Sequence, residues 1–77
     1  MKRSTYIIYL RGTWYALAMD MFCTVVESID GRAVVDNVRT VADRNAAIIS
    51  ACAPLPSWRD AYNVARSAGN YIGQLVS

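Results

Sequence analysis

Residues 13–26 form the most apolar stretch of the chain, interrupted in its middle by Asp20. The stretch is too short to cross a bilayer as a helix, because such a helix needs about 20 mostly apolar residues. A continuous apolar run fits a buried strand as well as a buried helix. The β-branched residues 24–26 and the turn-forming residues 29–32 favour a long strand that bends or bulges near Asp20. A helix over residues 14–28 is the alternative.

The N-terminal residues predict a β-hairpin. Residues 5–10 are rich in β-branched and aromatic side chains and stop at Arg11 and Gly12, so residues 14–19 are the predicted returning strand. Alternate positions give the first strand two apolar faces, one with Tyr6, Ile8 and Leu10 and the other with Ile7 and Tyr9. A sheet that is apolar on both faces has to be covered on both, by helices, by a second subunit or by a target.

A third strand is predicted after the turn at Asp30 and Gly31. Residues 32–41 alternate between apolar and polar side chains, and Asp36 and Arg39 indicate partial exposure, as at the edge of a sheet. Such an edge can pair with a second copy of the chain.

Two helices are predicted in the C-terminal half. The first covers residues 43–53, with Asp43 as its N-cap and a stop at Pro54. Ser57 begins the second helix, and Asp60 three residues later completes a capping-box pattern. The apolar positions of the second helix recur at helical spacing: Ala61, Val64, Ala65, Ala68, Ile72 and Leu75.

The second predicted helix also carries a ridge of small residues. Every fourth position is small: Ser57, Ala61, Ala65, Gly69 and Gly73. A ridge of this kind lets another backbone approach closely. Short connections place consecutive helices side by side, so the ridge is predicted to pack against the first helix, and a helix-to-helix dimer seam is the alternative.

The pattern as a whole predicts a single compact α+β domain over residues 1–77, a three-stranded antiparallel meander followed by a two-helix hairpin (β-β-β-α-α). Hydrophobic residues make up 55% of the chain, against about 45–50% in soluble domains by a similar count. A domain of this size hides less of its surface than a larger one. We therefore expect a homodimer or a stable complex with another protein, and no membrane contact.

Charge and cysteine content bear on the kind of partner and on the cellular compartment. The net charge is +2, with seven arginines and one lysine, which argues against a strong nucleic-acid field. Cys23 and Cys52 have no neighbouring Cys or His, so we expect both to be reduced and buried in a cytoplasmic protein. A Cys23–Cys52 disulfide is the alternative. The short apolar run near the N-terminus is cut at Arg11, which argues against a secretory signal.

No catalytic pattern is recognisable. The chain has no histidine, its glycines match no phosphate-binding loop, and its acids fall in predicted turns, caps and strand edges. We therefore expect no enzymatic activity, no cofactor and no metal site. Asp20 is the exception among the acids, because it lies alone in the apolar stretch and is predicted to mark a bulge or to pair with an arginine such as Arg39.

Aromatic and arginine side chains gather near the N-terminus. The predicted partner-binding residues are Tyr6, Tyr9, Arg11, Trp14 and Tyr15, since Tyr, Trp and Arg are enriched at the energetic centres of protein interfaces. The alternative is that these aromatic residues fill the core. We expect a small protein-binding module that acts as an inhibitor or adaptor, for instance a phage or mobile-element protein acting on a host protein. A small dimeric nucleic-acid-binding regulator and a sensor with a ligand pocket between sheet and helices are the alternatives.

Overall fold

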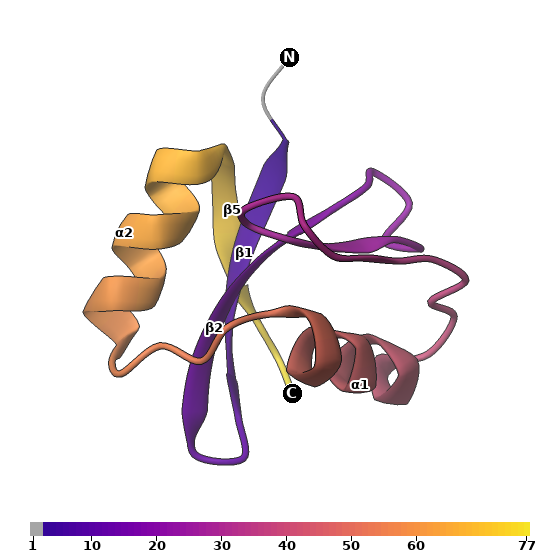
Figure 1. The fold of residues 1–77 in the computed structure, drawn as a ribbon, viewed down its shortest axis with the longest axis horizontal. Coiled ribbons are helices and arrows are strands. Elements are labelled where there is room, and N and C mark those ends of the chain that lie inside the picture. The colour runs from indigo at the N-terminus through magenta and orange to yellow at the C-terminus, as the bar shows by residue number, and fades with distance from the viewer. Residues whose placement is uncertain (1–2) are drawn as a thin grey trace.

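A five-stranded sheet carries one helix on each face in the computed structural model, which describes residues 3–77 (Figure 1). In chain order the elements are β1 (Ser4–Leu10), β2 (Thr13–Met19), β3 (Val26–Ser28), β4 (Val34–Val35), α1 (Val41–Ala51), α2 (Trp58–Ala68) and β5 (Asn70–Leu75). The strand order across the sheet is β4-β3-β2-β1-β5. β1 to β4 pair antiparallel with their neighbours, whereas β5 pairs parallel with β1, so the sheet is mixed.

The predicted α+β class is confirmed, but the predicted β-β-β-α-α order is not. A short fourth strand precedes α1, and a fifth strand follows α2. The two helices are therefore inserted between strands of one sheet and do not form a C-terminal unit of their own. No helix within residues 3–77 is long and apolar enough to cross a membrane.

The β1–β2 hairpin forms where the sequence predicts it. Arg11 and Gly12 both have positive φ angles, 48° and 77°, as a two-residue turn of type I′ requires. The register pairs Leu10 with Thr13 beside the turn and continues to the far end of both strands. This hairpin forms the centre of the sheet and fixes which side chains point to each face.

The central apolar stretch is neither one bent strand nor a helix. The chain leaves the sheet after Met19 and returns at Val26, so that a loop separates β2 from β3. Asp20 begins this loop, and its role there is described below. The apolar composition predicted burial, but residues 21–24 are exposed, and the bend or bulge predicted near Asp20 is a complete interruption of the strand.

The predicted third strand over residues 32–41 is mostly loop. Only Val34–Val35 pairs with β3. Asn37 then takes a positive φ of 58°, and the N–H of Val38 donates to the carbonyl oxygen of Thr24 at 3.0 Å. Val38 is buried in the core, so this segment turns inward and does not continue along the sheet edge.

The second helix ends at Ala68, and the residues that follow form β5. Gly69 passes so close to β1 that a Cβ atom there would lie 2.4 Å from the backbone oxygen of Arg3. The N–H of Asn70 donates to that same oxygen at 2.7 Å. Pairing with β1 begins directly after this glycine, at Asn70, and overrides the helical spacing that extends to Leu75, as tertiary contacts commonly override propensity.

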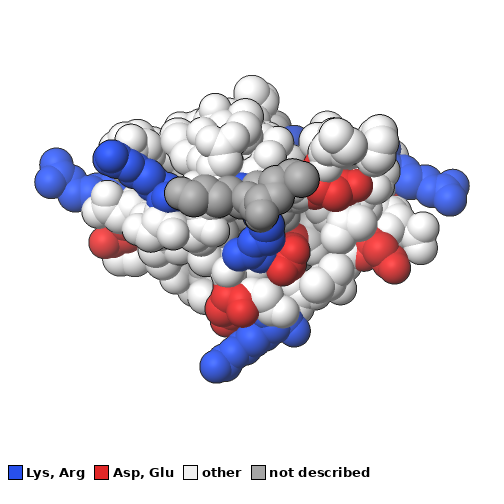
Figure 2. Space-filling model, turned by 90° about the horizontal axis from the view of Figure 1, so that it is seen from above, with Lys and Arg blue, Asp and Glu red and all other residues white. Residues whose placement is uncertain are grey.

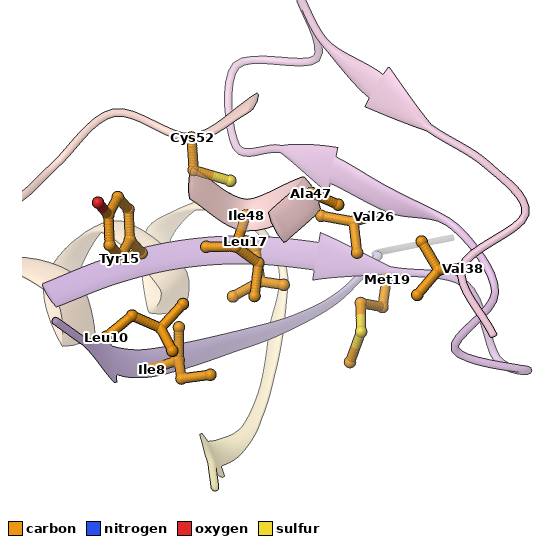
Figure 3. Close-up of a cluster of buried hydrophobic side chains, with 10 residues drawn as sticks. All are labelled: Ile8, Leu10, Tyr15, Leu17, Met19, Val26, Val38, Ala47, Ile48 and Cys52. Atoms are coloured by element: carbon orange, nitrogen blue, oxygen red, sulfur yellow. The ribbon is translucent and has the colours of Figure 1, made fainter. Parts of the chain in front are cut away.

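Each face of the sheet has its own core. Neighbouring residues Ile7 and Ile8 of β1 are both fully buried, one in each core. The core under α1 consists of Ile8, Leu10, Tyr15, Leu17, Met19, Val26, Val38, Ala47, Ile48 and Cys52 (Figure 3). The core under α2 consists of Ile7, Ala16, Ala61 and Ala65. The prediction that both faces must be covered is confirmed, and helices cover them.

The small residues predicted as a ridge pack against the sheet. Ala61 and Ala65 are fully buried in the core that contains Ile7. Because α1 and α2 lie on opposite faces of the sheet, the predicted side-by-side helical hairpin is wrong (Figure 1). Gly69 follows the last turn of α2 and Gly73 lies in β5, so neither extends a ridge along the helix.

Candidate functional site

The loop between β2 and β3, residues 20–25, presents two large apolar side chains to solvent; we call it the Asp20 loop. Met21 and Phe22 are 83% and 76% exposed, although both are bulky and adjacent in sequence. Exposed apolar side chains that lie together are typical of interaction sites. The geometry of the loop decides whether they belong to a preformed surface.

Hydrogen bonds within the loop shape its backbone. The carboxylate of Asp20 accepts from the N–H of Thr24 at 2.7 Å, from its hydroxyl at 2.9 Å and from the N–H of Val25 at 2.9 Å. The N–H of Cys23 donates to the backbone oxygen of Asp20 at 3.0 Å, and Cys23 has a positive φ of 58°. The bond from Val38 to Thr24 ties the loop to the segment before α1.

The pKa of Asp20 reflects this arrangement. Desolvation raises the pKa of its carboxyl group, but the hydrogen bonds from Val25 and Thr24 outweigh it and hold the pKa below the ordinary value. Asp20 therefore serves as the internal acceptor of the loop. The predicted roles, a bulge marker or a partner of Arg39, are replaced by this one.

The two cysteines differ in environment, and only one matches the prediction. Cys52 is buried under α1, where burial and, to a smaller extent, the charge of Asp30 raise the pKa of its thiol to about 11. Cys23 is exposed in the Asp20 loop, contrary to the prediction that both are buried. Both thiols are free, so the alternative disulfide does not form.

The predicted aromatic site is divided between the two faces of the sheet. Tyr15 belongs to the core under α1, and Tyr6 packs against the same core. Tyr9 and Trp14 lie on the α2 face, with ring centroids 4.8 Å apart. Arg11 is exposed in the hairpin turn. The five residues do not form one surface, and Tyr15 fits the core-filling alternative.

Tyr6 is the member of the predicted set that lies near the Asp20 loop. Burial chiefly raises the pKa of its hydroxyl, and the nearby Cys23 thiol raises it further. The partner-binding role of Tyr6, Tyr9, Arg11, Trp14 and Tyr15 remains a prediction.

A second aromatic row borders α2 and β5, and the sequence analysis missed it. Trp58 and Tyr62 are stacked with centroids 5.0 Å apart, and Tyr62 meets Tyr71 of β5 edge-on at 5.1 Å. The guanidinium carbon of Arg66 lies 6.0 Å from the Tyr62 ring centroid. The spacing of Trp58, Tyr62 and Arg66, four residues apart on a predicted helix, was the available signal.

The acids described in the structure have local partners. Arg3 contacts Glu27 at 2.7 Å, and Asp30 lies 3.7 Å from Arg32 in an exposed pair. The predicted contact between Ser57 and Asp60 is present: the hydroxyl of Ser57, the N-cap of α2, accepts from the N–H of Asp60 at 3.2 Å and donates to its carboxylate at 2.8 Å. The Ser57 and Asp30 contacts belong to a cap and a turn, whereas the Arg3–Glu27 pair connects the start of β1 to β3.

The N-cap of α1 is Thr40 and not the predicted Asp43. The hydroxyl of Thr40 accepts a hydrogen bond from the N–H of Asp43. Within residues 3–77 no group of three His, Cys, Asp or Glu side chains could hold a metal ion. Basic and acidic side chains are interspersed over the face that Figure 2 shows.

Comparison of the chain with protein-family models, with curated proteins and with solved structures gives no match.

Proposed function

We propose that this chain is a small non-enzymatic protein-binding module that acts as an inhibitor or adaptor, with the Asp20 loop as its contact to the target. The observation that carries the proposal is the exposure of Met21 and Phe22 at adjacent positions of a loop with three hydrogen bonds to one carboxylate. A fold that places such side chains in water forgoes the burial they would have in a core.

The rigidity of the loop supports a binding role. Ordering a flexible loop on binding costs free energy, and a loop already held in its bound shape avoids that cost. Large apolar anchors that enter a pocket on a partner commonly carry most of the binding energy. Phe22 supplies a ring for such a pocket, and Met21 supplies an adaptable neighbour whose flexible side chain fits irregular surfaces.

The nucleic-acid alternative has less support. A binder of phosphate backbones needs clustered positive charge. Here the net charge is only +2, Arg3 is paired with Glu27, and both signs are mixed over the visible face in Figure 2. We therefore retain protein binding as the single proposal.

The test is capture of the target by the immobilised protein from a host-cell lysate, compared between two double variants. Met21→Ser with Phe22→Ser removes the anchors and leaves the Asp20 hydrogen bonds in place. The matched control is Val34→Ser with Val41→Ser, two apolar residues that are also exposed but lie outside the loop.

We expect the wild-type protein and the control to retain a common target. The loop variant should bind this target with affinity reduced by about 30-fold or more, since loss of a central anchor costs about 2 kcal/mol or more. The affinity is measured by calorimetry once the captured protein has been purified. Equal affinity for the loop variant and the control would overturn the proposal.

A further inference from the structure

β5 is the outer strand of the sheet, and its second edge is open. It pairs with β1 on one side only, because it ends the strand order. Ile72 in its middle is 55% exposed. Residues 70–75 contain no charged residue and no proline, two features that natural proteins use to keep an open edge from pairing, and Ile72 is the extra residue where the register with β1 shifts between Tyr71 and Gly73.

The opposite edge of the sheet differs. β4 has only two residues, and Arg32 and Asp36 lie close to it in the chain. A two-residue strand flanked by charges offers little for another strand to pair with. The sheet therefore has one edge suited to pairing, and that edge is β5.

The flank of α2 beside this edge carries the aromatic row. Trp58, Tyr62 and Arg66 are spaced by one helical turn and lie on the side of α2 that meets Tyr71 of β5. Trp58 is 44% exposed, so the row is open to contact. Strand edge and helix flank thus form one surface of the molecule.

We infer that a second copy of this chain pairs with β5 through its own β5, antiparallel, so that one sheet continues across both copies. Identical strands paired in this way are related by a twofold axis perpendicular to the sheet. Such an axis leaves the two α2 helices on the same face, side by side and in opposite directions. The second copy that pairs with β5 therefore also brings its own α2 helix, with the same aromatic row, next to the first.

The row is complementary to its own reversed copy, which is the reason to assign a second copy and not a foreign strand. Reversal brings Arg66 of one copy towards Trp58 of the other, where a guanidinium and an aromatic face attract one another. Tyr62 then lies near the axis, at the level of Tyr71, next to Ile72 in β5.

The dimer leaves the Asp20 loop free. The loop joins β2 to β3, and β1 separates both of these strands from β5 in the sheet. The assembly would present two copies of the loop to a target, which strengthens attachment to a partner with two sites.

The experiment is sedimentation equilibrium of the full chain over a concentration series, with three variants. Ile72→Lys places like charges near the axis and should raise the dimer dissociation constant about 100-fold. Arg66→Glu, at an exposed helix position, should weaken the dimer by about tenfold and tests the helix contact without altering the strand. Val34→Lys is the matched control, because Val34 is equally exposed on the opposite edge, and it should leave the dimer intact.

A monomeric wild-type protein at high micromolar concentration would overturn the inference. A dimer that resists both Ile72→Lys and Arg66→Glu, or one that Val34→Lys dissociates, would place self-association elsewhere and also overturn it. Circular dichroism of each variant establishes that it is folded, and Arg66→Glu decides the case if Ile72→Lys unfolds. The Met21→Ser, Phe22→Ser variant should remain dimeric, so this inference and the proposed function can fail separately.

Discussion

Gly69 and Gly73 are both glycines and lie four residues apart, yet the space around their Cα atoms differs. The sequence pattern placed both on one ridge of a helix. In the structure a Cβ atom at Gly69 would lie 2.4 Å from the Arg3 oxygen and 2.9 Å from Cγ2 of Thr5, whereas one at Gly73 would have nothing within 4 Å. The spacing of small residues was readable from the sequence, but the backbone that approaches only one of them was not.

Substituting alanine for each glycine in turn should reveal this difference as opposite changes in stability. Gly69→Ala should lower the free energy of unfolding by about 1–3 kcal/mol, because the Arg3 backbone must shift to admit the methyl group. Gly73→Ala should raise it by up to about 1 kcal/mol, because the unfolded chain loses freedom and the folded chain has space. Urea denaturation at one protein concentration measures both. Equal effects of the two substitutions would contradict the close approach at Gly69.

At the scale of elements, prediction succeeded where the pattern was local. The β1–β2 hairpin and the start of α2 follow from neighbouring residues, a turn pair at Arg11 and Gly12 and a cap at Ser57. β5 was missed because its strand state depends on β1, far away in the sequence. The Asp20 loop was predicted in part: the sequence showed that Asp20 is unusual, but it did not show that its carboxylate accepts hydrogen bonds within the loop.

The Asp20 loop should make stability depend on pH. The pKa of Asp20 is lowered in the folded chain, so its contribution is complete above the unfolded pKa, near 3.8, and is lost as the pH falls through the folded value. Asp20→Asn should therefore destabilise the protein at pH 7, and its difference from wild type should shrink towards pH 2. Denaturation curves at pH 7, 4 and 2 measure the effect.

The matched control for this loop is Asp36→Asn. Asp36 is exposed, and within residues 3–77 its carboxylate accepts a hydrogen bond only from the neighbouring Asn37, at 3.5 Å. This substitution should change stability little at any of the three pH values. A difference between Asp20→Asn and wild type that stays constant from pH 7 to pH 2 would exclude the carboxylate as the stabilising acceptor.

For the whole molecule, the requirement for two covered faces could be read from β1, whose alternate positions are apolar on both sides. The sequence did not show which element covers which face. That assignment depends on the segment between α1 and α2, which passes from one face of the sheet to the other where Leu55 donates its N–H to the Trp14 oxygen at 2.8 Å. The same sheet serves both cores, so each core depends on the strands that support the other.

The two cores should therefore unfold together. Ile7→Val and Ile8→Val each remove one methylene-sized group from a fully buried position, on opposite faces, and each should cost about 0.5–1.5 kcal/mol. Fluorescence reports the α2 side, because Trp14 packs against that core and Trp58 lies in α2, whereas circular dichroism reports the whole chain. In a two-state domain Ile8→Val shifts both signals to the same lower midpoint, although its own core contains no tryptophan. Separate midpoints for fluorescence and circular dichroism in the Ile8→Val protein would show that the faces unfold independently, and the shared sheet would then not couple them.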